Sequence, residues 1–142
     1  MHIVTRIASA AAVALFALGG AAAANAAPAI PLNNGQETTD AKGGAHGMFR
    51  YTIDGDQFCY TLDVAGLTVA AAAAHVHSAP RGEAGPIRIP LIVPNETSFH
   101  VEGCTTVSDP AILAGVQDNP GGWYVNVHTS TYPGGEVRGQ LK

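Results

Sequence analysis

Short segments in which hydrophobic and polar residues alternate recur along this chain, and they predict a protein built of β-strands. Residues 43–53 alternate in this way, and residues 57–64 alternate again. Side chains two positions apart point to the same face of an extended strand, so this alternation indicates strands with one buried face. The Asp-Gly-Asp sequence at residues 54–56 favours a tight turn between them. The two segments therefore predict a β-hairpin.

Two prolines shape the interpretation of other short apolar segments. Residues 29–32 contain Pro31, and residues 87–93 contain Pro90. Proline cannot donate a backbone hydrogen bond, so it is confined mostly to edge strands and bulges. We therefore expect residues 29–32 to form an edge strand and residues 87–93 to lie at an edge or a bulge. An alanine run at residues 70–74 is too short for an independent helix and leads into a strand.

One short helix is predicted near residue 110. Pro110 suits the first helical position, and Ser108 or Asp109 can cap the helix. The apolar residues that follow have helical spacing, and a Pro-Gly-Gly sequence at residues 120–122 ends the segment. Seven or eight short strands with one short helix predict an all-β fold, as an antiparallel sandwich or barrel.

The beginning of the chain predicts export. The sequence has 142 residues, and residues 7–18 are apolar and uncharged. Residues 24–26, Ala-Asn-Ala, have the small-x-small form of a signal-peptidase site. We therefore expect residues 1–26 to be a signal peptide and residues 27–142 to be a single domain, with retention as an uncleaved anchor as the alternative. This organisation predicts a secreted, periplasmic or cell-envelope protein with no stable membrane insertion after cleavage.

The charge limits the classes of partner that the chain is expected to bind, and the cysteines indicate a disulfide bond. The formal net charge is −4, and basic residues form no stripe, so nucleic acid is not an expected partner. The two cysteines, Cys59 and Cys104, lie in the predicted mature domain. An even number of cysteines in an exported chain favours one disulfide bond, and two buried free thiols are the alternative.

Half of the six histidines lie in two short apolar segments. His75 and His77 project from the same face of one predicted strand, and His128 shares a face with Tyr124 and Asn126 on another. If these strands are neighbours, the three imidazoles converge and can hold a metal ion, for which imidazole is a common ligand. Copper and zinc are the expected candidates.

A structural hydrogen-bond cluster is the alternative to a metal site. In that case the imidazoles bond to backbone carbonyls or to Thr129, which follows His128 directly. In the metal interpretation, Tyr124, Asn126 and Thr129 instead orient the ligands from outside. His46 falls on the solvent side of its strand, and no role is assigned to His100.

Ordered motifs over residues 29–142 resemble the CHRD domain, the module named after chordin. The motifs are Cys59-Tyr60-Thr61-Leu62, Gly66-Leu67-Thr68, Ala74-His75-Val76-His77, Gly82-Glu83-Ala84-Gly85-Pro86, Asn119-Pro120, Trp123-Tyr124-Val125-Asn126-Val127-His128-Thr129, Pro133-Gly134-Gly135-Glu136 and Arg138-Gly139-Gln140-Leu141. The resemblance implies an all-β antiparallel sandwich, immunoglobulin-like or superoxide-dismutase-like, outside the cytoplasm. It implies binding to an extracytoplasmic protein or ligand and does not imply an enzyme.

A fainter similarity links the chain to copper–zinc superoxide dismutases. It consists of the His-Val-His sequence, a late Val-x-Val-His and a C-terminal Gly-x-x-Arg-Gly. That resemblance implies copper ligands at His75, His77 and His128, and a role for Arg138 in guiding an anion. No histidine lies between residues 78 and 99, so the bridging ligand of that family is missing, and so is its zinc cluster. A surface or loop-bracing ion pair, with Glu136 as the candidate partner, is the alternative for Arg138.

No catalytic residues are predicted. The chain has no Gly-x-Ser-x-Gly nucleophile motif, and its glycine-rich residues 43–47 lack the lysine of a phosphate loop. The sequence therefore predicts an exported CHRD-domain protein that acts as a binding or interaction module with a three-histidine metal site. The alternative is a copper-binding or superoxide-dismutase-like metalloprotein.

Overall fold

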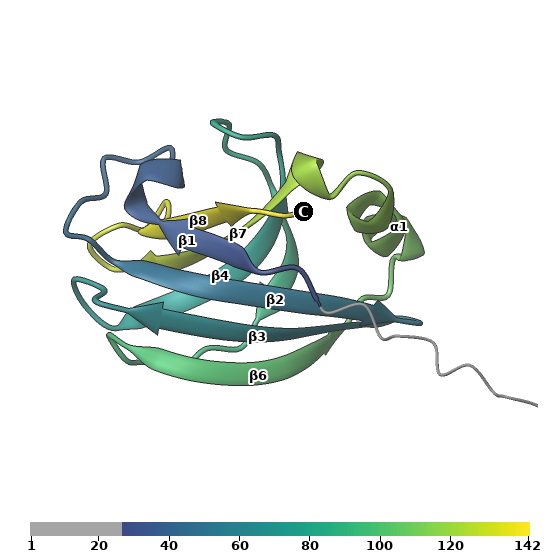
Figure 1. Ribbon diagram of the computed structural model, residues 1–142, viewed down its shortest axis with the longest axis horizontal. Helices are drawn as coiled ribbons and strands as arrows, with labels where there is room; N and C mark the ends of the chain where they lie inside the picture. Colours follow the sequence, from purple (N-terminus) through teal and green to yellow (C-terminus); the bar gives the residue numbers. More distant parts are fainter. Residues whose placement is uncertain (1–26) are drawn as a thin grey trace, which may run out of the picture.

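A computed structural model describes residues 27–142 and shows a single curled sheet of eight strands (Figure 1). Every neighbouring pair is antiparallel, and the strand order is β5-β4-β7-β8-β1-β2-β3-β6. The strands are β1 (Ile30–Asn33), β2 (His46–Asp54), β3 (Gln57–Ala65), β4 (Ala71–Ser78), β5 (Ile87–Leu91), β6 (Phe99–Thr106), β7 (Trp123–Thr129) and β8 (Val137–Gln140). The predicted signal peptide, residues 1–26, lies outside the described residues.

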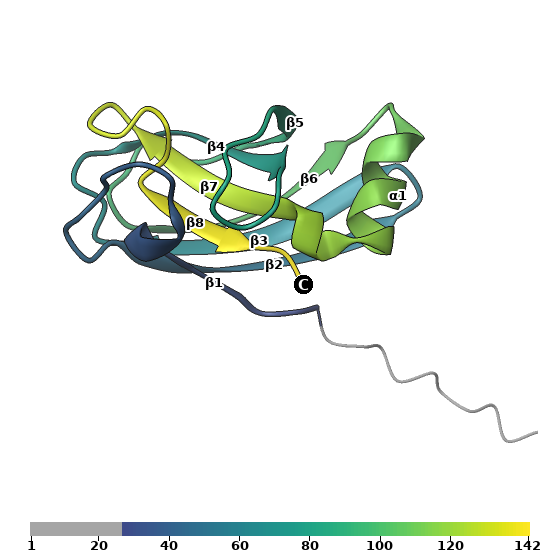
Figure 2. The same cartoon turned by 90° about the horizontal axis from the view of Figure 1, so that it is seen from above.

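Side chains close the gap between the two ends of this sheet. The Tyr60 hydroxyl accepts from Ile92 N at 2.7 Å and donates to Ile92 O at 3.0 Å. The Thr105 hydroxyl donates to Pro90 O at 2.8 Å. The sheet therefore curls into a nearly closed barrel, which Figure 2 shows from above. The all-β antiparallel prediction is confirmed, and the strands form one continuous barrel-like sheet rather than the two packed sheets of a sandwich.

The two proline predictions have different outcomes. Pro90 lies in β5, at one end of the strand order, so the edge prediction is confirmed. Pro31 lies in β1, which is placed between β8 and β2, so the edge prediction for residues 29–32 is wrong. The fold tolerates Pro31 because β1 pairs with β8 only at Asn33 and Arg138. Pro31 is therefore outside that ladder and needs no donor there.

The predicted hairpin is formed by β2 and β3, which join through the two-residue turn Gly55-Asp56. Gly55 has a φ of +58°, a left-handed conformation that glycine adopts without steric cost. Phe49 and Phe58 are fully buried, and their ring centroids lie 6.3 Å apart in the core. The alternation in the sequence therefore translates directly into a buried and a solvent face.

A disulfide bond joins β3 to β6. Cys59 and Cys104 lie directly opposite each other in the register and are bonded, with a Cα–Cα distance of 4.0 Å. This confirms the disulfide prediction over the alternative of two free thiols. Closing a loop of this sequence separation, 45 residues, stabilises the folded state by about 3–4 kcal/mol in the chain-entropy model.

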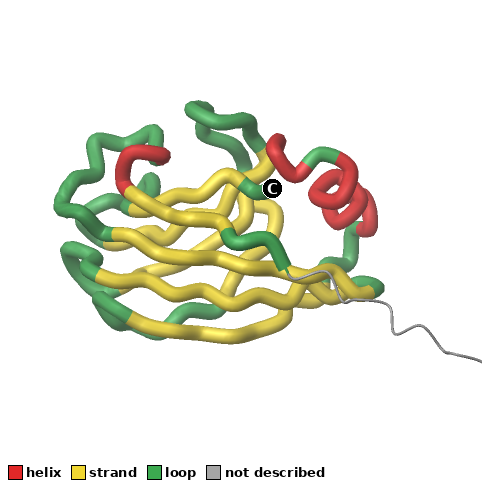
Figure 3. Tube along the Cα trace, viewed as in Figure 1, coloured by secondary structure: helices red, strands yellow, loops and turns green. Residues whose placement is uncertain are grey.

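One α-helix, α1 (Pro110–Asp118), covers one open end of the barrel, at the right of Figure 1 and in red in Figure 3. It begins where the sequence predicts: the Asp109 side chain accepts from Ala111 N at 3.0 Å. Leu113 and Val116 are buried and anchor the helix to the core. Two 3-10 turns, η1 (Asn34–Gln36) and η2 (Pro120–Gly122), complete the described elements.

Candidate metal centre

Strands β4 and β7 pair side by side, and this pairing assembles the candidate site. In their register His77 lies opposite Tyr124, and His75 lies opposite Asn126. Because side chains alternate along a strand, Val76 between the two histidines points into the core, where it is 0% exposed. His75 and His77 therefore project from the outer face of the sheet, beside His128.

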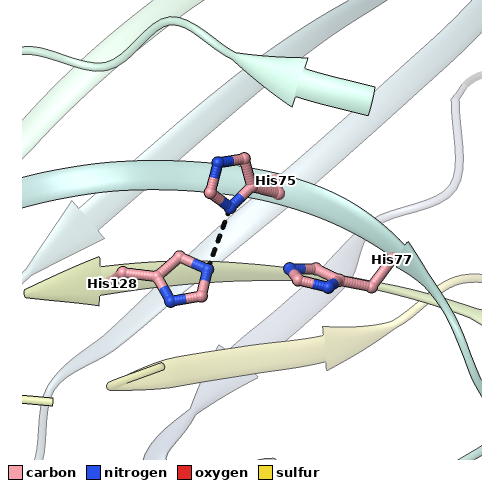
Figure 4. A group of neighbouring side chains, drawn as sticks. All are labelled: His75, His77 and His128. Atoms are coloured by element: carbon pink, nitrogen blue, oxygen red, sulfur yellow. Dashed lines mark hydrogen bonds between the residues drawn. The ribbon is translucent and has the colours of Figure 1, made fainter. Parts of the chain in front are cut away.

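The three imidazoles converge on one small volume (Figure 4). Each of His75, His77 and His128 offers one ring nitrogen, and these nitrogens lie within 4.8 Å of one another. Their ring centroids are 4.9–5.7 Å apart. His77 is buried, whereas His75 and His128 are half-buried, so the group faces solvent on one side. We call these three residues the histidine site.

Backbone carbonyls fix the proton positions on two of the rings. His77 Nδ1 lies 2.8 Å from Gly85 O, and His128 Nδ1 lies 2.9 Å from Pro133 O. A carbonyl oxygen only accepts, so each Nδ1 carries the hydrogen and donates it. Each Nε2 then carries a lone pair in the neutral ring. Oriented imidazoles of this kind are typical of metal-ligating histidines, whose other nitrogen donates to a carbonyl.

The third histidine bonds to its neighbour. His75 Nδ1 lies 3.0 Å from His128 Nε2. Since His128 Nε2 is the acceptor, His75 Nδ1 is the donor. If the His75 proton moves from Nδ1 to Nε2 of the same ring, a metal ion can bind Nδ1 in place of that hydrogen. Ligand nitrogens held tetrahedrally at a metal–nitrogen distance of about 2.0–2.1 Å lie about 3.4 Å apart. Bonding to one ion would require nitrogens that lie within 4.8 Å of one another to move to this closer spacing.

Burial keeps the three rings uncharged. Desolvation, with help from His128 and His77, lowers the pKa of His75 from 6.5 to about 4. Desolvation also lowers the pKa of His77 and of His128. Because a metal ion binds the neutral imidazole, these pKa values leave the site ready for binding at neutral pH.

Tyr124 and Asn126 lie beside the histidine site, and Thr129 does not contact the imidazoles. The Tyr124 ring stacks on His77 with a centroid distance of 4.7 Å and an interplanar angle of 4°. Its hydroxyl accepts from Gly85 N at 3.2 Å, so Tyr124 and His77 hold the same loop residue. The Thr129 hydroxyl instead donates to Glu136 at 2.7 Å. Two of the imidazoles bond to carbonyls, and none of the three bonds to Thr129.

Arg138 is a buried clamp. It is 1% exposed, and its guanidinium carbon lies 3.4 Å from the Tyr124 ring centroid. The guanidinium donates to Glu83 O at 2.7 Å, to Pro80 O at 2.9 Å and to Gln140 Oε1 at 3.0 Å. It therefore braces residues 79–86, the covering loop, over the outer face of the sheet. Arg138 therefore braces a loop, as the alternative role predicts, but it does so through carbonyl and amide oxygens and not through an ion pair.

Glu136 is occupied elsewhere and does not pair with Arg138. Its carboxylate accepts from Thr68 N at 2.7 Å, from the Thr68 hydroxyl at 3.0 Å and from Thr129. Of the three remaining histidines, His2 lies outside the described residues, and the other two lie outside the site. His46 is exposed, as predicted, and His100 forms an exposed pair with Asp63 at 2.7 Å.

One residue near the site has no counterpart in the sequence-based prediction. Both carboxyl oxygens of Glu37 are buried without a hydrogen-bond partner, as are His77 Nε2 and Asn126 Oδ1. Desolvation raises the Glu37 pKa from 4.5 to about 7, against the lowering effects of Arg138 and Asn126. No local pattern marks this residue, because it follows a turn far from the histidines in sequence.

The metal-free protein is expected to lose stability in acid through these histidines. The His75 imidazole takes up a proton near pH 6.5 in the unfolded chain but only near pH 4 in the folded protein. The contribution of neutral His75 to folding stability is therefore present above pH 6.5 and is lost as the pH falls toward 4. Glu37 has the opposite effect, because its raised pKa favours the folded state below pH 7. Urea unfolding of wild type and His75→Asn at pH 7 and pH 5, with chelator, separates the two effects. The variant should lose less stability in acid, and equal losses would contradict this assignment.

Comparison with known proteins gives one match. A family model of the CHRD domain matches residues 19–141, nearly the whole chain. No curated protein and no solved structure matches significantly. Among residues 27–142, no helix is long and apolar enough to cross a membrane. The matched region contains the whole of the histidine site.

Proposed function

We propose that this chain, which belongs to the CHRD domain family, is an exported protein that binds one transition-metal ion through His75, His77 and His128. One observation carries the proposal: the three ring nitrogens lie within 4.8 Å of one another. They are held there by two paired strands and by hydrogen bonds to backbone carbonyls, so the site needs little ordering when the ion arrives.

The chemistry of the site favours copper or zinc. Imidazole nitrogen suits both metals. Three neutral nitrogen ligands leave a further position for water or for a group from outside, as in zinc and copper sites that are not closed. Divalent copper generally binds a given nitrogen site more tightly than zinc, so we expect the affinity for Cu²⁺ to exceed that for Zn²⁺.

A binding role outside the cytoplasm suits the rest of the chain. The signal-like residues 1–26 and the disulfide between Cys59 and Cys104 both favour an oxidising compartment. The open coordination position would allow an extracytoplasmic protein or small ligand to reach the ion. No residue is assigned a catalytic role.

The superoxide-dismutase alternative gains no support from the geometry. It needs a cation beside the ion that can attract an anion from solvent. Arg138, the candidate, is 1% exposed, and its donors are used by the covering loop and Gln140. Metal binding is therefore the function that the arrangement supports best.

The direct test is metal uptake by the purified protein. Native mass spectrometry with Cu²⁺ or Zn²⁺ should show one ion per chain, and the melting temperature should rise. An ion that binds only the folded state stabilises it by about 2.7 kcal/mol at a free concentration of 100 times Kd. A protein that takes up neither ion and shows no melting shift would end the proposal.

A further inference from the structure

Glu37 is the buried titratable group that the proposed site leaves unused. We propose that Glu37 is the counter-charge of the histidine site: it holds a proton while the site is empty and releases it when a divalent ion binds. This inference rests on the proposed metal binding, and it assigns that site a regulation by pH.

Two hydrogen bonds hold the segment that contains Glu37 against the turn between β7 and β8. The Asn34 side chain donates to Glu136 O at 2.8 Å, and the Thr39 hydroxyl donates to Gly135 O at 2.8 Å. Glu37 lies between these two anchors, so its side chain is held against Gly135. Gly135 has a φ of +128°, which only glycine adopts readily.

Gly135 is also where Glu37 meets Asn126. A Cβ atom at Gly135 would overlap Glu37 Oε1 and would lie 2.7 Å from Asn126 Nδ2. Carboxyl and amide therefore share the space above this glycine. Asn126 lies on β7 opposite His75 and also acts on His77, whose pKa its side chain raises. A single amide thus separates the carboxyl from the ligands.

Few charges face Glu37. Arg138 of β8 is the cation that lowers its pKa, and Arg81 of the covering loop bonds to the preceding residue, Gln36, at 3.1 Å. The nearby carboxylate of Glu136 is already satisfied by Thr68 and Thr129. Beyond Asn126 the neighbours are the three histidines, which are neutral. Glu37 is therefore the carboxyl that can change its charge when the site fills.

Charge balance gives the direction of the change. Three neutral imidazoles contribute no negative charge, so a bound ion adds two positive charges on the face of the sheet that already holds buried Arg138. A nearby positive charge favours the ionised form of a carboxyl group. Glu37 therefore passes from COOH to COO⁻, and its proton goes to the solvent buffer while the metal–nitrogen bonds form. Nothing is oxidised or reduced.

The test is the number of protons released when Zn²⁺ binds. Calorimetric titrations at pH 6.5 in two buffers of different ionisation enthalpy give this number for wild type, Glu37→Gln and Glu96→Gln. The Glu96 side chain is exposed and lies outside the covering loop, so its variant is the matched control for loss of one carboxyl. With a pKa of about 7, Glu37 is roughly three-quarters protonated at pH 6.5. Wild type and Glu96→Gln should therefore release about 0.7 proton more than Glu37→Gln.

A second readout excludes a merely structural role. Carbon-13 NMR of the Glu37 carboxyl should show its titration midpoint falling well below pH 7 when Zn²⁺ is bound, and Glu37→Gln should bind Zn²⁺ about 10-fold more weakly. If all three proteins bind Zn²⁺ with equal proton release, the role of Glu37 is overturned and the metal site stands. If none binds Zn²⁺, the proposed function fails first, and the Glu37 inference fails with it.

Discussion

Replacing His77 with alanine is expected to weaken Zn²⁺ binding by more than about 100-fold, because loss of even an outer partner of a ligand costs 10–100-fold. His77 is the most deeply buried residue of the histidine site, and its Nε2 has no hydrogen-bond partner. Without it, two half-buried histidines remain to hold the ion. Isothermal titration or competition with a chelating dye measures the change.

The chain supplies its own control for this variant. His46 is exposed, and its Nδ1 lies 3.1 Å from Gly44 O on the solvent side of β2. His46→Ala removes an imidazole without touching the histidine site and should bind Zn²⁺ as wild type does. Equal weakening in the two variants, or none in His77→Ala, would show that the ion binds somewhere else.

Replacing Arg138 with alanine is expected to destabilise the fold by about 3–5 kcal/mol, the usual cost of breaking a buried charged network. The change leaves the carbonyls of Pro80 and Glu83 and the side chain of Gln140 without their donor. It also removes the cation from the Tyr124 ring. A loss of this size lowers the melting temperature of a domain of this length by roughly 10 °C or more, which calorimetry measures directly.

The Arg138 variant should also loosen the histidine site. Tyr124 and the covering loop position His77 through its ring stack and its bond to Gly85, so Zn²⁺ affinity should fall by about 10-fold. Arg88→Ala is the matched control, because Arg88 is exposed and its side chain bonds only to Ser78 among the described residues. If both arginine variants melt within about 2 °C of wild type, Arg138 is not the clamp described here.

Local patterns were enough to predict much of this molecule. The alternation in β2 and β3 and the turn between them follow from backbone geometry that neighbouring residues determine. The same geometry places His75 and His77 on one face. The cap and the proline at Asp109 and Pro110 predicted the start of α1 for an equally local reason.

The contacts that depend on distant segments could not be predicted in this way. His75 and His128 are 53 residues apart, and only the register of β4 with β7 brings their nitrogens to 3.0 Å. Residues 29–32 do not form the edge strand that Pro31 suggests, because a single proline does not determine which strands flank its own. The burial of Glu37 could not be predicted, because it depends on where residues 34–39 pack against the turn at Gly135.

The most direct measurement is a crystal structure of the zinc-loaded protein with anomalous data collected at the zinc edge. The account predicts one anomalous peak, about 2.0–2.1 Å from His75 Nδ1, His77 Nε2 and His128 Nε2. An ion that binds at other residues, or three imidazoles that remain hydrogen-bonded without an ion in a zinc-saturated crystal, would contradict it.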